Sequence, residues 1–145
     1  MSKIAPITSL QPPYSLVKRD VENDQLTWCG DHGVGTIVYS PMGSGLLTGA
    51  MTKERVSNLP PGDWRRGNPQ FQEPQLSENL ALAERLKSVG ARHGRTAAEA
   101  ALAWVLRKPE VTGAIVGARN ASQVDGLIHG GDLKLSPEEI TEIEG

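Results

Sequence analysis

The sequence predicts an α/β fold built on parallel strands. Three uncharged segments rich in β-branched residues, 4–10, 36–39 and 111–116, alternate with segments of helical periodicity. This alternation is typical of βα units, because parallel strands need crossover connections that helices usually supply. At 145 residues the chain is long enough for one domain with its own core, and no linker divides it. We therefore expect residues 1–145 to form a single domain.

The first elements follow from apolar runs and their breakers. Residues 4–10 predict a short strand that ends at the Gln-Pro-Pro-Tyr sequence of residues 11–14. Residues 20–33 have the pattern of a weak helix. Residues 36–39 predict a buried strand, since they are uncharged and Pro41 follows them.

A long segment without periodicity follows, from Gly49 to Ser77. It contains four prolines together with glycine and asparagine breakers. A loop of this length in a compact domain is usually either a functional lid or a disordered insertion. We expect a lid loop over residues 49–77, with the second interpretation still open.

The second half contains clearer helices. Residues 79–90 place leucine and valine on one face, and a Thr96-x-x-Glu99 capping box opens the next helix, which stops before Pro109. Its expected apolar stripe comprises Ala98, Ala101, Leu102, Val105 and Leu106. After the strand at 111–116, Asn120 caps a short helix. Ser136-Pro-Glu-Glu139 caps the last one.

Composition excludes several classes of function. The net charge is −2 with both signs interspersed, so neither nucleic acid nor an anionic membrane surface is expected as a partner. Cys29 is the single cysteine, which excludes an internal disulfide, and the three histidines lack the spacing of metal ligands. The sequence has no long apolar run and no signal-peptide pattern, so we expect a cytoplasmic protein without a metal site.

Two strand-to-loop junctions carry the candidate chemistry. Residues 37–49 run from an apolar strand into a Gly-rich loop, and residues 114–119 repeat this pattern and end in Arg119. The carboxyl ends of parallel strands meet at one edge, where N–H groups freed by glycine and the charge of Arg119 can bind phosphate. The spacing Gly43-Ser44-Gly45 fits neither a dinucleotide fingerprint nor a P-loop. The loop therefore has a second interpretation, as a plain turn without a role in binding.

The same residues have simpler interpretations. Arg119 can be a solvated surface residue, and Gln123 can complete a capping box with Asn120. Tyr39 can point into a pocket from the strand end, or it can be a core aromatic with a hydrated hydroxyl. Spacing alone supports no catalytic group.

Five ordered motifs resemble one family. SLQPPYSLVKR, GTIVYSPMGSGLLTG, TAAEAALAWVLRKP, AIVGARNASQVDG and LSPEEITEIE resemble the C-terminal half of an aldo-keto reductase. The resemblance implies part of a (β/α)8 TIM barrel, with the last three parallel strands, their helices and the large loop after the seventh strand. It also implies NADP as cofactor, bound in extended form at the C-terminal face.

The resemblance implies roles for nine residues. Gln11 matches the amide that holds the nicotinamide carboxamide, and Tyr39 matches the aromatic that stacks on the nicotinamide ring. The segment around the pyrophosphate and the neighbouring ribose is matched by Ser40, Met42 and Ser44. The segment at the adenosine 2′-phosphate is matched by Gly117, Ala118, Arg119 and Gln123. The chain departs from the family at Gly126-Leu127, where many relatives have Glu-Asn that contacts the adenine.

No catalytic residue is assigned to this chain. In the family an Asp, a Tyr acid, a Lys and a His come from earlier strands, and neither Tyr14 nor Tyr39 matches the acid. The resemblance therefore implies the NADP-binding half of an enzyme that reduces aldehydes or ketones to alcohols, inactive alone. Two alternatives are a half that regains activity on assembly with an N-terminal half or as a homo-oligomer, and a non-catalytic nucleotide- or partner-binding subunit.

The expected sheet would be incomplete. Three strands leave two edges and an inward apolar face that includes Ile37 and Ile115. We expect such a chain to self-associate, to pair with the missing half, or to fold only loosely.

Overall fold

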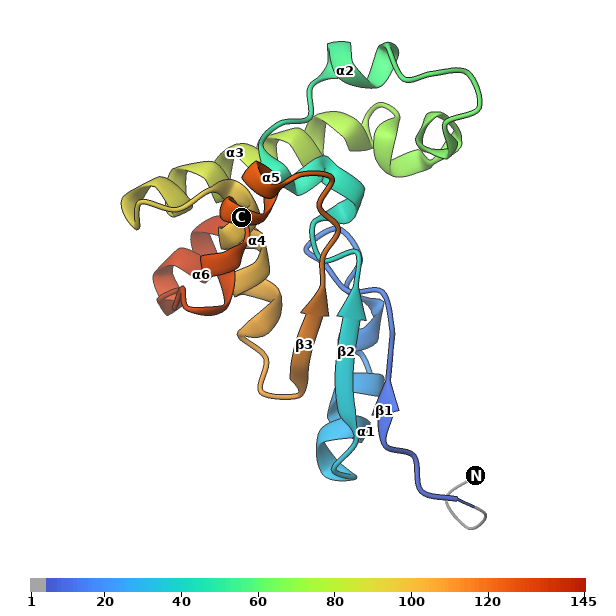
Figure 1. Ribbon diagram of the computed structural model, residues 1–145, viewed down its shortest axis with the longest axis vertical. Helices are drawn as coiled ribbons and strands as arrows, with labels where there is room; N and C mark the ends of the chain where they lie inside the picture. The colour runs from blue at the N-terminus through green and yellow to red at the C-terminus, as the bar shows by residue number, and fades with distance from the viewer. Residues whose placement is uncertain (1–4) are drawn as a thin grey trace.

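The computed structural model describes residues 5–145 as a parallel sheet with helices on one face (Figure 1). The strands are β1 (Ser9–Leu10), β2 (Gly35–Tyr39) and β3 (Val111–Ile115), in the spatial order β1-β2-β3. Leu10 lies opposite Thr36, and Tyr39 lies opposite Ile115, with every pair parallel. The predicted α/β class with parallel strands is confirmed.

Strand β1 is shorter than the sequence indicates. Of the expected strand 4–10, Ile4 lies outside the described residues, and only Ser9 and Leu10 form the strand. The one neighbour of β1 among the described strands is β2, which begins at Gly35, whose N–H donates to the carbonyl of Thr8 at 3.1 Å. Residues before Thr8 have no strand opposite them. They therefore form no sheet hydrogen bonds, although their β-branched side chains favour a strand.

The segment between β1 and β2 forms two helical pieces. A 3₁₀ turn, η1 (Asp20–Glu22), precedes α1 (Gln25–Asp31), where the sequence predicted one weak helix over 20–33. The polypeptide after β2 forms a second 3₁₀ segment, η2 (Gly43–Thr48).

The long helices lie where they are predicted. Helix α3 (Gln75–Arg92) buries the predicted leucine and valine face, and α4 (Ala97–Leu106) begins with the Thr96/Glu99 capping box. All residues from Ala97 to Val105 are buried, beyond the single predicted stripe, because α4 contacts α3, β3 and η5 (Ile128–Gly131). The last helix, α6 (Pro137–Glu144), has the predicted Ser136/Glu139 capping box.

The segment 49–77 is ordered rather than a disordered insertion. It contains α2 (Lys53–Ser57), η3 (Trp64–Gly67) and η4 (Pro69–Phe71). Gln70 Nε2 donates to the carbonyl of Val17 at 3.0 Å, and Asn79 Nδ2 donates to the carbonyl of Gln70 at 2.9 Å. These bonds to distant parts of the chain, together with buried Phe71, hold the segment beside the strand ends. We call residues 49–77 the lid.

One face of the sheet carries the core and the other is open. Thr36 and Val38 of β2 are fully buried toward the helices, whereas Ile37 and Tyr39 are 38% and 43% exposed. Ile115 of β3, opposite Tyr39, is 46% exposed. Strand β2 is therefore buried on one face only, which corrects its interpretation as a buried strand. The expected exposed apolar face with Ile37 and Ile115 is confirmed.

Replacing Gly90 by alanine should destabilise the chain by about 1–3 kcal/mol, because the added methyl group overpacks a tight junction. A Cβ at Gly90 would lie 2.7 Å from the carbonyl oxygen of Thr96 and 2.9 Å from that of Arg95. This clash outweighs the roughly 1 kcal/mol by which alanine favours a helix. Urea unfolding measures the change. The control is Gly67→Ala, whose Cβ would meet nothing within 4 Å; equal stability of the two variants would contradict the prediction.

Candidate functional site

The chain turns sharply where β2 ends. Ser40 and Ser44 have φ values of 53° and 55°, in the left-handed region that only glycine adopts without strain. Gly43 has φ 57°, and a Cβ there would lie 2.9 Å from Cγ2 of Val17. The N–H of Gly43 donates to the carbonyl of Ser40, and that of Gly45 donates to Met42. The expectation that these two glycines free their N–H groups for phosphate is therefore wrong, since both groups close the turn itself.

A groove of about 500 Å³ lies between this turn and the segment that follows β3. As expected from the parallel strands, residues of both strand-to-loop junctions line this one groove, although they are far apart in the chain. Six of the nine predicted cofactor residues line it: Ser40, Met42, Ser44, Gly117, Arg119 and Gln123. Thr48, at the end of η2, and Met51 of the lid line it too. Its volume is within the usual range for small-molecule and cofactor sites.

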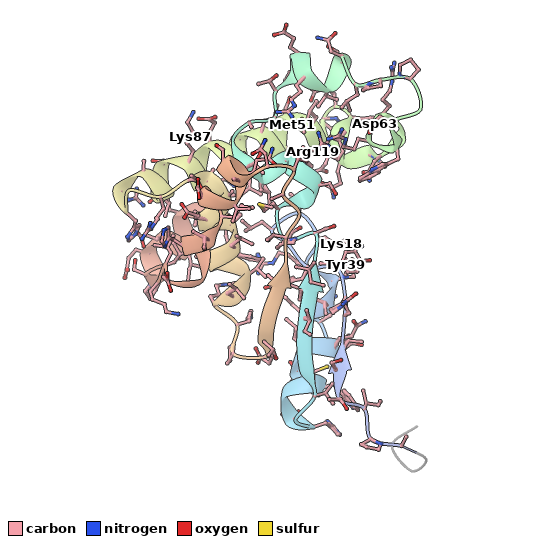
Figure 2. All side chains as sticks on the ribbon, in the orientation of Figure 1. Lys18, Tyr39, Met51, Asp63, Lys87 and Arg119 are labelled. Atoms are coloured by element: carbon pink, nitrogen blue, oxygen red, sulfur yellow. The ribbon has the colours of Figure 1, made fainter. Side chains whose placement is uncertain are left out.

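Three arginines gather at this groove. Arg119 follows β3, while Arg55 and Arg65 come from the lid. Arg55 Nη1 donates to the carbonyl of Ala50 at 3.1 Å, and Arg65 is held in a fork by Asp63 at 2.7 and 2.9 Å. Arg119 makes no ion pair with any residue in 5–145. Figure 2 places Asp63 and Arg119 at the same end of the molecule, beyond the strands.

The two lid arginines were missed by the sequence analysis. Arg55 lies in a short helix capped by Thr52, and Arg65 directly follows the exposed Trp64. Threonine at position 52 is a residue type that favours a helix N-cap, but nothing in the sequence linked either arginine to the strand ends.

The short helix after β3 shows what the Gln123 side chain bonds. Helix α5 (Ala121–Asp125) is capped by Asn120, whose Oδ1 accepts from the N–H of Gln123 at 3.0 Å. Gln123 does not complete a capping box. Its Oε1 instead accepts from the N–H of Arg119 at 2.7 Å. This bond engages the N–H of Arg119 and fixes the backbone that carries the Arg119 side chain.

The other three predicted residues lie outside the groove lining. Tyr39 ends β2 on the open face and lines an adjacent cavity that also includes Ser40 and Ser44. Gln11 is exposed directly after β1, and Ala118 is exposed between Gly117 and Arg119. All nine residues stay predictions as cofactor contacts.

The Asp63 carboxyl should titrate far below its ordinary range. Its hydrogen bonds from Arg65 lower its pKa from 3.8 to about 2, and the charge of Arg119 adds to this effect. Because the folded pKa is depressed, the stabilisation is present above the unfolded value of 3.8 and is lost as the pH falls through about 2. A carbon NMR titration of the carboxyl measures this, with Arg65→Met expected to raise the midpoint. A midpoint near 3.8 in the unaltered chain would contradict the assignment.

The second tyrosine is occupied elsewhere. The Tyr14 hydroxyl is buried, donates to a carboxylate oxygen of Glu22 and accepts from Arg107 Nη1 at 3.1 Å. Burial, and then the bond to Glu22, raise the pKa of Tyr14 above its ordinary value. Its proton is therefore held within the core rather than presented to a ligand. Cys29 is buried as well.

With this geometry, comparison with known proteins defines the family. The sequence pattern of the aldo/keto reductase family matches residues 1–145. The chain belongs to the aldo/keto reductase family. The three parallel strands and their helices are part of a TIM barrel, as the motifs implied.

Relatives of this aldo-keto reductase chain are longer than it is. It is 35% identical over 140 residues to a probable aldo-keto reductase 1 of Glycine max, with 97% of the chain and 40% of the relative covered. It is 33% identical over 141 residues to the aldo-keto reductase YhdN of Bacillus subtilis (strain 168), with 97% and 42% covered. The chain thus spans about two fifths of the length of these relatives.

A solved structure agrees with the fold. The glycerol dehydrogenase AKR11B4 from Gluconobacter oxydans superposes with a TM-score of 0.88 at 30% identity, over 99% of this chain and 43% of that protein. Within residues 5–145, no helix combines the length and the apolar character that crossing a bilayer requires.

Proposed function

We propose that this chain provides the NADP-binding side of an aldo-keto reductase that reduces aldehydes or ketones to alcohols. The observation that carries the proposal is the groove in which predicted cofactor residues meet three arginines. Clustered guanidinium groups suit a ligand with several phosphates. Arg119 has no carboxylate partner among residues 5–145, whereas the Asp63 carboxylate already holds the fork of Arg65. NADP differs from NAD by one phosphate. Arg119 lies in the motif that resembles the family's binding segment for that phosphate.

The residues of the groove, together with Tyr39 and Gln11 outside its lining, fit an extended dinucleotide. Tyr39 offers an exposed aromatic face at the strand end for the nicotinamide ring, and the amide of Gln11 lies beyond the neighbouring strand. The hydroxyls of Ser40 and Ser44 line the path toward Arg119 and can donate to phosphate and ribose oxygens. When bound, NADPH supplies the hydride for the reduction. This chain's residues bind and orient it.

We propose that the open face packs against further strands of the same barrel, and that catalysis needs them. A parallel sheet is normally covered on both faces, and here Ile37, Tyr39 and Ile115 are uncovered. The relatives are more than twice as long as this chain, which supports such packing. Tyr14 of this chain cannot donate a proton to the substrate carbonyl, because its hydroxyl lies in the core.

We also propose a cytoplasmic location, which fits the single cysteine of the sequence.

The isolated chain should bind NADPH without turning it over. Calorimetry with NADPH measures binding, and the NADPH absorbance with an added aldehyde measures turnover. Adding a fragment with the N-terminal strands of the Bacillus subtilis relative should then restore aldehyde reduction. Turnover by the chain alone would overturn the assignment of catalysis to the other strands. Absence of NADPH binding, in the chain and in the reassembled pair, would overturn the proposed cofactor role.

A further inference from the structure

Helix α6 is attached to the fold largely through charged groups. Half of its eight residues are glutamates, and one residue, Ile143, is buried. Ile140 is partly buried against the core, and Arg85 Nε donates to the carbonyl of Ile143 at 2.9 Å. An isolated helix shorter than about 12–15 residues is marginal in water. The helical form of α6 therefore depends on its contacts with α3 and α4, beside which it lies in Figure 1.

Two carboxylates of α6 face the C-terminal end of α3. Glu142 accepts from Nη1 of Arg92 at 3.1 Å and from its Nη2 at 2.7 Å. Glu139 lies 2.7 Å from Nε2 of His93 and 3.7 Å from Nε of Arg92. Among residues 5–145, Arg92 pairs with no carboxylate outside α6. These charges therefore connect the two helices directly.

The last residue of α6 is held by a second group of contacts. Glu144 accepts from the indole N–H of Trp104 at 3.0 Å and from Arg107 at 3.2 Å. It also pairs with Arg19 at 3.2 Å. Glu22 of η1 pairs with both of these arginines. If Glu144 moved away, Arg19 and Arg107 would still have a carboxylate partner, so the residues beneath α6 would stay paired.

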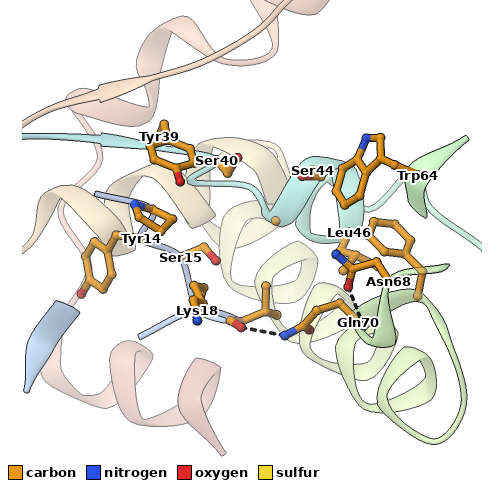
Figure 3. A pocket seen from close by; sticks show the side chains of 14 residues that line it. Tyr14, Ser15, Lys18, Tyr39, Ser40, Ser44, Leu46, Trp64, Asn68 and Gln70 are labelled. Carbon is orange, nitrogen blue, oxygen red and sulfur yellow. Dashed lines mark hydrogen bonds between the residues drawn. The ribbon is translucent and has the colours of Figure 1, made fainter. Parts of the chain in front are cut away.

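The lid is anchored by groups of a different kind. The side-chain amide of Gln70 donates to the carbonyl of Val17, the bond drawn in Figure 3, and its oxygen accepts from Asn79. Phe71 is almost completely buried. Amides and aromatic rings keep their charge state in acid, whereas a carboxylate becomes neutral and gains a proton to donate. Acid therefore acts on the attachment of α6 and not on these anchors of the lid.

The pH dependence of the α6 contacts has a definite sign. Hydrogen bonds from Arg92 lower the pKa of Glu142. The N–H of Ser136, and then His93, lower the pKa of Glu139. Because both pKa values are depressed below 4.5 in the folded chain, the stabilisation is present above pH 4.5 and is lost as the pH falls through the lowered values.

We propose that α6 is an acid-sensitive strap, which opens as one unit while the sheet, α3 and α4 stay folded. All residues of α4 from Ala97 to Val105 are buried, whereas α6 buries one, so local opening should cost α6 much less free energy. Opening would separate Arg92 and His93 from their carboxylate partners and uncover the indole N–H of Trp104. The inference does not depend on the proposed cofactor role.

The test follows the full chain by NMR from about pH 7 to about pH 3. The amides of Ile140 and Ile143 should lose their helical chemical shifts at a pH where the amides of α4 keep theirs. The indole N–H of Trp104 should shift in the same step, because it loses Glu144 as acceptor. The side-chain amide of Gln70 is the internal control and should not change in this step. A single transition, in which α6 and α4 change together, would overturn the inference.

Two matched substitutions test whether the charges hold α6. Glu142→Gln should raise the open population at neutral pH by about twofold to fivefold, measured as hydrogen exchange of the Ile143 amide. A purely local effect has the opposite sign, because removing a negative charge near a helix C-terminus favours the helix. The control is Glu84→Gln, which makes the same change in charge where Glu84 pairs with Lys87 within α3. It should leave the exchange of α6 unchanged.

A third variant removes the cation instead of the carboxylate. Arg92→Met should raise the open population at least as much as Glu142→Gln, since Arg92 also faces Glu139. In the double variant the increase should be smaller than the product of the two single effects, because their shared pair is lost only once. Equal exchange of α6 in Glu142→Gln and Glu84→Gln would show that the ion pairs do not hold this helix, and would overturn the inference.

Discussion

Replacing Arg119 with methionine should weaken NADPH binding by about tenfold to a hundredfold, because a charge-assisted hydrogen bond to phosphate is lost. NADH, which lacks the 2′-phosphate, should bind almost equally to both proteins. Arg119 is exposed at the groove and its backbone is fixed by Gln123, so the substitution removes charge without disturbing packing. Calorimetric titration with each cofactor measures the difference.

The matched control for Arg119 is Lys87→Met. Lys87 lies on the exposed face of α3, distant from Arg119 in Figure 2, and the substitution makes the same change in net charge. It should leave both affinities unchanged at moderate salt, since charges beyond a Debye length of about 10 Å are screened. Equal losses for NADPH and NADH in Arg119→Met would show that this side chain does not read the 2′-phosphate.

Replacing Arg107 with methionine should destabilise the fold by about 2–4 kcal/mol, because it removes one of the two cations that pair with the partly buried carboxylates of Glu22 and Glu144. Arg107 donates to the Tyr14 hydroxyl at 3.1 Å, to the carbonyl of Trp104 at 2.7 Å and to Glu144 at 3.2 Å. Its guanidinium also lies 3.7 Å from the centroid of the Trp104 ring. One residue thereby joins the loop after β1, the end of α4 and the end of α6.

Chemical denaturation measures the effect of Arg107→Met, and Arg107→Lys isolates its cause. Lysine keeps the charge but cannot reproduce the planar fork, so it should recover part of the stability. Arg19, which also pairs with Glu22 and Glu144, remains in both variants and limits the loss. If Arg107→Met unfolded at the same denaturant concentration as the unaltered chain, the cluster would have no net stabilising role.

Helix starts were predictable because their signals are local. The Thr96/Glu99 and Ser136/Glu139 boxes are complete within four consecutive residues, so reading the sequence was sufficient. The length of β1 and the structure of the lid were not predictable in this way. They depend on partners far along the chain, such as Thr8 with Gly35 and Gln70 with Val17.

The site shows the same division. Ser40, Ser44 and Arg119 lie within five residues of a strand end, and parallel strands bring their carboxyl ends together whatever the intervening sequence. Arg65 reaches the groove only because Asp63 holds it and the lid folds beside the strand ends. No period or motif encodes that placement, which explains why the lid arginines could be found only in the structure.

The open face has a consequence for how such a barrel can be divided. The core lies behind the sheet, where Val38, Leu86 and Trp104 are fully buried, whereas Ile37 and Ile115 contribute little to it. Packing that holds the piece together is therefore physically separate from the surface that would complete a catalytic barrel. Substitutions of Ile37 and Ile115 can therefore change which surface packs against the open face, while the core that stabilises this chain stays intact.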